Sequence, residues 1–205
     1  MVLAVEVKTS PVEGLEVIPL TVTKYHQMLR AGIFEEGEPV ELLHGLLVAK
    51  ERGGQMVVSP RHRQAVHRFL ELASRLAAAG GHLQLQSPVT IEPSHEPEPD
   101  AMLVRGSGND YAARHPSPAD VSCVIEVAES SLPRDRGPKL RIYAAAGIPQ
   151  YVIVDLNRDL VELHERPDPQ GQRYRQVETL GPGDELPLLL PNGERLKMAV
   201  AACLP

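Results

Sequence analysis

The chain has 205 residues, a hydrophobic content of 42% and a charged content of 23%, which supports a stable domain without disulfides. A net charge of −6 argues against a broadly basic nucleic-acid-binding surface, and an aromatic content of 3% argues against stacking platforms for single strands. With two cysteines, no signal-peptide pattern and no apolar run of about 18 residues, the sequence predicts a cytoplasmic protein without a membrane span.

The N-terminal part predicts an arm, a short helix and a hairpin. Residues 1–20 form the arm, and Thr21 or Thr23 caps a helix over TKYHQMLRAG. The next run, EPVELLHGLLVAKE, has two apolar arms that flank His44 and Gly45, so a β-hairpin with a tight turn is expected.

A long helix and three strands follow. The helix begins at Ser59-Pro60 and ends at Gly80-Gly81, because apolar residues recur between them at helical spacing. The alternating segment 82–91 predicts a strand with Pro88 at a bulge or edge, and the segment 99–105, PDAMLVR, predicts the next strand.

The third strand lies in the run VSCVIEVAESS, which starts at Val121 and is apolar on both faces. One face would carry Val121, Cys123, Ile125 and Val127, and the other Ser122, Val124, Glu126 and Ala128. A strand of this kind is buried on both sides, so the carboxylate of Glu126 requires a cation, a metal or several hydrogen-bond donors.

The C-terminal part adds a helix and further strands. The regular part of the helix is KLRIYAAAG, with Pro133 and Pro138 bracketing its entry. PQYVIVDL predicts a strand, DLVELHER and QRYRQVETL an antiparallel pair, and the tail short apolar pieces around Asn192-Gly193. The order predicts one α/β domain over residues 1–205, with a mixed central sheet flanked by helices.

Two acids stand where neighbouring strands would bring them together. Asp100 opens one predicted strand and Glu126 lies within the next, so both can reach one end of the sheet. Two close carboxylates stay ionised when a cation lies between them, and Mg²⁺ is a natural choice because it takes oxygen ligands.

A basic stretch follows the central strand. Lys139 lies thirteen residues after Glu126, near Arg134, Arg136 and Arg141. A lysine beside a metal-bound water can stabilise the charge that develops on a phosphate, and Tyr143 lies one helical turn further along the same face. Each residue alone also has an ordinary structural interpretation, as a turn cap or a surface ion pair.

Histidine and glycine motifs give no further site. The histidines at 26, 44, 82, 95, 115 and 164 form no HxH or HxxxH pair, so no zinc site is predicted. The GSG at 106–108 does not match a phosphate-binding fingerprint.

The run IEVAESSLPRDRGPKLRIYAAAGIPQYVIVD, together with Pro99-Asp100 and the upstream VELLHGLLV, resembles the Uma-two family of restriction-endonuclease-like proteins. That family belongs to the PD-(D/E)XK nuclease superfamily, and the resemblance extends from about Thr21 to the C-terminal strands. It implies a restriction-endonuclease-like core with a metal-dependent phosphodiesterase site. Asp100 and Glu126 match the metal-binding acids, Glu41 the acid of the upstream hairpin, and His62 a histidine at the start of the first long helix.

The sequence departs from the superfamily motif at Ala128, where the usual lysine would stand two residues after the second acid. In the Uma-type pattern a lysine on the following helix takes its place, and Lys139 matches it. The first turn of that helix can reach back over the end of the strand.

These observations predict a magnesium-dependent endonuclease that hydrolyses DNA. Glu41, Asp100 and Glu126 would hold Mg²⁺ or Mn²⁺, Lys139 would act with Asp100 and Glu126 in catalysis, and the expected substrate contacts are His62, Arg136 and Tyr143. A homodimer is plausible because duplex cleavage needs two active sites. The alternatives are a catalytically silent module for binding or dimerisation, and a metal-dependent hydrolase of small phosphoesters; the acidic net charge fits both.

Overall fold

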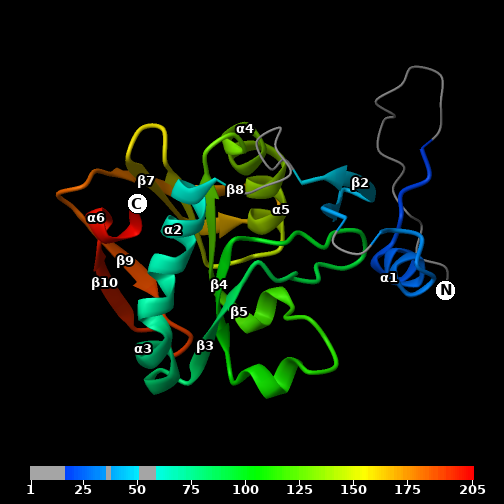
Figure 1. Cartoon of the computed structure of the whole chain (residues 1–205), viewed down its shortest axis with the longest axis horizontal. Coiled ribbons are helices and arrows are strands. Elements are labelled where there is room, and N and C mark those ends of the chain that lie inside the picture. The colour runs from blue at the N-terminus through cyan, green and yellow to red at the C-terminus, as the bar shows by residue number, and fades with distance from the viewer. Residues whose placement is uncertain (1–16, 36–37, 51–58) are drawn as a thin grey trace.

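The computed structural model describes residues 17–35, 38–50 and 59–205, so most of the predicted N-terminal arm lies outside the described residues (Figure 1). Its centre is a six-stranded sheet in the order β3-β4-β5-β6-β7-β8. The strands are β3 (Gly81–Leu85), β4 (Ala101–Arg105), β5 (Val121–Ala128), β6 (Gln150–Asp155), β7 (Leu160–Asp168) and β8 (Arg173–Leu180). Only β5 and β6 pair in parallel within this sheet. The predicted mixed α/β fold is therefore confirmed.

The central strand β5 is buried on both faces, as its apolar run predicts. Cys123, Ile125 and Val127 pack into one core cluster, whereas Val124 and Ala128 belong to the cluster on the other face. The prediction for Val121 was wrong, because it joins the second cluster. The register of the β4–β5 pair shifts between Leu103 and Val104, and an irregularity of this kind breaks the alternation of side chains.

One face of the sheet is covered by the first long helix and by the C-terminal elements (Figure 1). Ser59 caps the helix by accepting a hydrogen bond from the backbone N of His62 at 3.1 Å. The predicted single helix is divided into α2 (Pro60–Arg68), the 3₁₀ turn η1 (Phe69–Leu72) and α3 (Ala73–Ala78). The same core includes residues of β9 (Glu185–Leu189), β10 (Arg195–Ala199) and α6 (Val200–Cys203).

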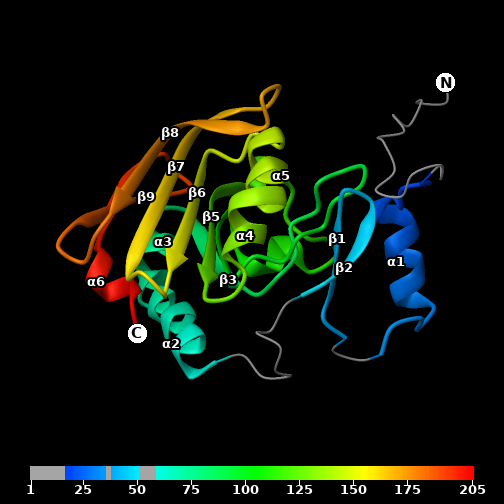
Figure 2. The same ribbon diagram turned by 90° about the horizontal axis from the view of Figure 1, so that it is seen from above.

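The opposite face carries the connection between β5 and β6 (Figure 2). It consists of α4 (Leu132–Arg134), the π-turn η4 (Asp135–Lys139) and α5 (Leu140–Ala145). The helix thus starts earlier than predicted and contains Pro138 inside it. Proline lacks the N–H for the regular helical hydrogen bond and its ring crowds the preceding turn, which the wider π-turn accommodates.

The segment between β3 and β4 is irregular. The strand predicted over 82–91 was wrong beyond Leu85, where β3 ends. Gln86 has a φ of 45°, a left-handed conformation that interrupts the extended chain before Pro88.

Two short 3₁₀ turns, η2 (Gly108–Tyr111) and η3 (Pro118–Asp120), occupy the loop between β4 and β5.

The N-terminal elements lie beside this irregular segment, at one side of the sheet (Figure 2). They are α1 (Val22–Arg30), β1 (Val40–Leu43) and β2 (Leu46–Ala49). Thr21 caps α1, and the hairpin turns at His44 and Gly45, both with positive φ as a tight hairpin turn requires. The backbone N of Glu96 donates to the carbonyl of Leu42 at 2.7 Å. In the part of the chain that the structure describes, no helix combines the length and apolar character needed to cross a bilayer.

Candidate active site

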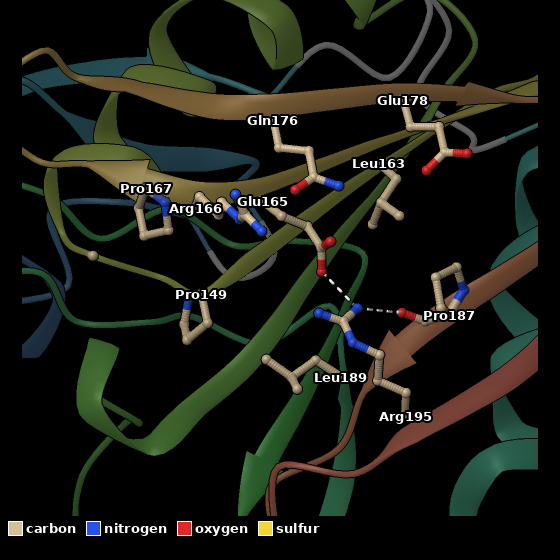
Figure 3. Close-up of a pocket in the computed structure, with 11 residues that line it drawn as sticks. Pro149, Leu163, Glu165, Arg166, Pro167, Gln176, Glu178, Pro187, Leu189 and Arg195 are labelled. Atoms are coloured by element: carbon tan, nitrogen blue, oxygen red, sulfur yellow. Dashed lines mark hydrogen bonds and ion pairs between the residues drawn. The ribbon is translucent and has the colours of Figure 1, made fainter.

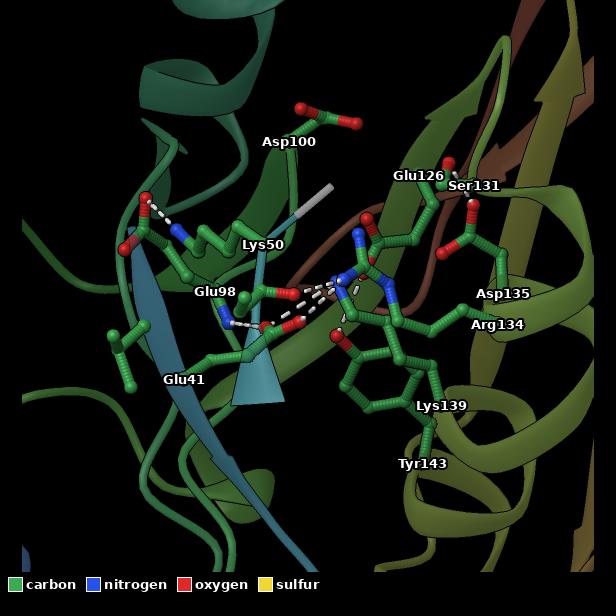
Figure 4. A network of polar contacts seen from close by, with 12 residues as sticks. Glu41, Lys50, Glu98, Asp100, Glu126, Ser131, Arg134, Asp135, Lys139 and Tyr143 are labelled. Carbon is green, nitrogen blue, oxygen red and sulfur yellow. Dashed lines mark hydrogen bonds and ion pairs between the residues drawn. The ribbon is translucent and has the colours of Figure 1, made fainter. Parts of the chain in front are cut away.

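A network of buried charges forms where β1, β5 and η4 meet (Figure 4). Glu41 comes from β1, Glu126 from β5 and Lys139 from the end of η4. All three side chains are buried, with at most 4% of each residue exposed. Buried charges of this kind require partners, so their contacts define the site.

Lys139 lies between the two glutamates. Its Nζ is 2.9 Å from Oε1 of Glu126 and 3.5 Å from Oε2 of Glu41. The hydroxyl of Tyr143 donates to the same Oε1 of Glu126 at 2.9 Å. Arg134 adds a second cation, with Nη1 3.7 Å from Oε1 of Glu41. The helix after β5 therefore delivers the lysine that Ala128 does not provide.

The electrostatics of the network favour a proton or another cation at Glu126. Burial raises the pKa of Glu126 to about 8, and the carboxylates of Asp135, Asp100 and Glu41 add to this effect while Lys139 opposes it. Burial alone would lower the pKa of Lys139, but the charges of Glu126 and Glu41 outweigh burial and raise it. Lys139 is thus an ammonium at neutral pH.

Asp100 lies directly before β4 and forms a second pair beside the network. The β4–β5 register pairs Ala101 with Ile125, which sets Asp100 next to Glu126 along the sheet. Oδ2 of Asp100 accepts from the backbone N of Val127 at 2.8 Å and lies 3.2 Å from Nε2 of His62. The carboxylate of Asp100 points away from Lys139 (Figure 4).

The pKa shifts of Asp100 and His62 both favour the ionised form of this pair. Burial would raise the pKa of Asp100, but the hydrogen bond and charge of His62 and the Val127 N–H outweigh it and lower the pKa. Burial would likewise lower the pKa of His62, but the hydrogen bond and charge of Asp100 raise it. The structure thus brings His62 to Asp100, with the backbone of β5 linking this pair to Glu126.

Asp135 is a member of the site that the sequence did not reveal. It is buried in η4, and Oγ of Ser131 donates to its Oδ2. Burial raises the pKa of Asp135, although Lys139 and Ser131 oppose the shift. In the sequence Asp135 stands between two arginines, a pattern typical of an exposed charged turn. Its inward position is a property of the π-turn, which only the structure shows.

Two predicted substrate contacts occupy other positions. Tyr143 has no exposed surface, and its hydroxyl donates to Glu126. Arg136 hydrogen-bonds Glu162, and its Nη2 lies 3.8 Å from Oδ2 of Asp155. Arg136 therefore faces β6 and β7, outside the network around Lys139.

A family model matches residues 22–200 and carries the description "Putative restriction endonuclease". The chain belongs to the Uma2 family. The match covers every element of the site, from Glu41 to Tyr143, and it confirms the resemblance found in the sequence.

The fold of this Uma2 chain also resembles a solved structure. That structure is titled as a "putative nuclease belonging to DUF820" from Anabaena variabilis ATCC 29413. The two chains are 16% identical and superpose with a TM-score of 0.63, over 90% of this chain and 97% of the other. At this identity the likeness shows a shared nuclease-like fold. No curated protein matches the Uma2 chain in sequence.

The acids of the Uma2 site carry oxygen donors of the kind that a hard divalent cation prefers, although among the described residues only His26, Glu96 and His115 bring three ligand atoms within 4.8 Å of one another. Glu41, Asp100 and Glu126 offer only oxygen ligands, which suits Mg²⁺ or Mn²⁺. Oε1 of Glu41 is buried and accepts no hydrogen bond within the described residues, and its cationic neighbour is Nη1 of Arg134 at 3.7 Å. Burial first, and then the carboxylates of Asp135, Asp100 and Glu41, raise the pKa of Glu126, so a cation nearby would stabilise its ionised form.

The Uma2 chain also has a surface pocket away from these acids. Its volume is about 620 Å³, and it lies among β7, β8, β9 and β10 (Figure 3). Arg195 spans it, with Nη1 2.7 Å from Oε1 of Glu165. None of the acids around Lys139 lines this pocket.

Proposed function

We propose that this Uma2 chain is a divalent-metal-dependent endonuclease that hydrolyses DNA phosphodiester bonds. The observation that carries the proposal is the buried Glu41–Lys139–Glu126 network with the Asp100–His62 pair beside it. Metal-dependent phosphodiester hydrolysis uses acids that hold a metal ion together with a protonated lysine close to them. Membership of the family supports the same reaction class.

Glu41, Asp100 and Glu126 would hold the metal ion, Mg²⁺ or Mn²⁺. A divalent ion in such a site lowers the pKa of its bound water and neutralises charge on the phosphate. Two observations support this assignment: Oε1 of Glu41 accepts no hydrogen bond within the described residues, and the pKa of Glu126 is raised.

The chain's own residues orient these acids. The backbone N of Glu98 donates to Oε2 of Glu41 at 3.1 Å, and Tyr143 and Lys139 fix Glu126 through Oε1. His62 and the Val127 N–H fix Asp100. Lys139 would also stabilise negative charge that develops on the phosphate, because it keeps its proton at neutral pH.

Plasmid nicking tests the proposal. Purified protein with Mn²⁺ or Mg²⁺ should convert supercoiled DNA to open circles, and chelation should stop the conversion. Glu126→Gln keeps the size of the side chain but weakens metal binding, and Lys139→Ala removes the ammonium, so each should lower the rate at least about 100-fold. Glu71→Gln, at an exposed position, serves as the matched control.

Thermal melting separates loss of folding from loss of activity, since both variants lie at buried positions. Equal nicking by the wild type and by folded Glu126→Gln protein would overturn the assignment. Absence of nicking by the wild type with either metal, on duplex and single-stranded DNA, would do the same.

A catalytically silent binding module is the second candidate. The position of Lys139 between Glu41 and Glu126 favours it, because the ammonium neutralises the acids without a metal ion. Calorimetric titration with Mn²⁺ discriminates: a silent site gives no heat that depends on Asp100 and Glu126. A small-phosphoester hydrolase would instead cleave model diesters without binding duplex DNA. We expect an active endonuclease to be a homodimer, which sedimentation would detect.

A further inference from the structure

A second group of possible metal ligands lies outside the acidic network. It consists of His26 in α1, Glu96 in the irregular segment before β4, and His115 in the loop before β5. One ligand atom from each residue lies within 4.8 Å of the other two. The three residues are far apart in the sequence, so no local motif such as HxxxH predicts the group.

The carboxylate of Glu96 is the buried member of this group. Nε2 of His26 is 2.8 Å from both carboxylate oxygens, and Oγ1 of Thr90 donates to Oε2 at 2.7 Å. Glu96 is only 3% exposed, whereas His115 is exposed and His26 is half-buried. One side of the group is therefore fixed in the protein, and the other is open to entry from solvent.

Backbone hydrogen bonds hold the three segments together. The N–H of Val22 donates to the carbonyl of Pro93 at 2.9 Å, which ties α1 to the segment that carries Glu96. The N–H of Thr90 donates to the carbonyl of Pro116 at 2.8 Å, which ties the same segment to the residue after His115. A site whose ligands are positioned in advance loses little conformational entropy when it binds.

We propose that His26, Glu96 and His115 form a binding site for Zn²⁺. Two imidazoles and one carboxylate are ligands that zinc takes in a tetrahedral site, with a water or a further group at the fourth position. The acidic network differs, because its donors are oxygens and select harder cations. The ion would link α1 to the loops that carry Glu96 and His115. The hydroxyl of Thr90, which donates to Glu96, would keep this carboxylate oriented towards the ion.

Zinc titration of three proteins tests this assignment. The wild type should bind one Zn²⁺ tightly enough to compete with a chromophoric chelator, and His115→Ala should weaken this affinity at least about 100-fold. His115 is exposed, so its loss should leave the fold intact. His67→Ala removes another exposed histidine, on α2, and should bind as the wild type does.

Three further measurements test where the ion binds. Co²⁺ in the wild type should give the visible absorption of a tetrahedral site, and His115→Ala should abolish it. Glu126→Gln should retain the zinc affinity, because the acidic network is separate. Excess Zn²⁺ should also raise the Tm of the wild type but not of His115→Ala.

The proposal is overturned if the wild type binds no Zn²⁺ in this competition, since His26 and Glu96 then form a simple hydrogen-bonded pair. It is equally overturned if His115→Ala binds as the wild type does, because the ion then lies elsewhere. Neither outcome affects the nuclease proposal, which rests on other residues.

Discussion

Two neighbouring residues of β5 point to opposite faces of the sheet and have different surroundings. Ile125 points into the apolar cluster that lies beneath α2 and α3. Glu126, the next residue, points to the α5 face and meets Lys139 and Tyr143. Farther along that face, β7 contributes Glu162, which bonds Arg136. The acids that contact Lys139 therefore lie on one side of the sheet, whereas on the other side Glu165, which shares a face of β7 with Leu163, pairs with Arg195.

This difference assigns separate roles to the two faces. Apolar burial stabilises a fold in proportion to the area removed from water, whereas a buried ionic network contributes little net stability and serves function. Substitutions on the α2–α3 face should therefore change stability, and substitutions on the α5 face should change metal binding. Three measurements test that division, beyond the nicking and zinc assays.

Truncation on the apolar face should have the largest effect. Ile125→Ala removes a fully buried side chain and leaves a cavity, so the free energy of unfolding should fall by about 2–5 kcal/mol. Urea denaturation measures the loss, and Mn²⁺ affinity per folded molecule should stay unchanged. Val177→Ala, at a side chain that is 57% exposed, is the control and should change stability by less than about 0.5 kcal/mol. Similar losses for the two variants would contradict the division.

The pH dependence of metal binding should have an intermediate effect. Glu126 in the metal-free protein has a pKa of about 8, so its proton competes with the ion at lower pH. Raising the pH towards 8 removes that proton, and Mn²⁺ affinity should therefore rise about tenfold per pH unit before it levels off. Calorimetry in buffers of different ionisation enthalpy would detect the proton released. An affinity that is flat between about pH 6 and 8 would exclude Glu126 as a ligand that binds after losing a proton.

Removal of one hydroxyl should have the smallest effect. Tyr143→Phe deletes a donor to Glu126, which favours the protonated carboxyl and should weaken Mn²⁺ binding severalfold at pH 7. Stability should fall by about 1 kcal/mol. Tyr174→Phe is the matched control, because its hydroxyl donates to the carbonyl of Ile148 in the same core. Tyr174→Phe should lose similar stability without any change in Mn²⁺ affinity. Equal losses of Mn²⁺ affinity in the two variants would show that removal of any buried hydroxyl in this core weakens metal binding, and would contradict a specific role for Tyr143.

Local features of the fold were predictable from sequence. The cap at Thr21, the turn at His44-Gly45 and the burial of β5 all follow from residue type and spacing, and the structure confirms each. Long-range and irregular features were not. The bulge that reverses Val121 depends on the partner strand, and the inward position of Asp135 depends on a π-turn that contains a proline.

The candidate site shows the same limit. Asp100 and Glu126 could be expected at neighbouring strands, and the family resemblance added Glu41, His62 and Lys139. The pairings among them could not be expected: Asp100 pairs with His62, and Lys139 binds both Glu126 and Glu41. The grouping of His26, Glu96 and His115 also depends on tertiary structure. Spacing rules detect ligands within one element, whereas this group spans one helix and two loops.

The π-turn η4 has a consequence for how the helix after β5 can vary. Each residue of an α-helix advances the side-chain direction by about 100°, so an extra residue in one turn changes the direction of everything on its far side. Arg134 before the turn can thereby contact Glu41 and Tyr143 after it can contact Glu126, while Ile142 and Ala144 stay packed in the core. The π-turn therefore lets one helix contribute both to the acidic network and to the apolar core on the α5 face.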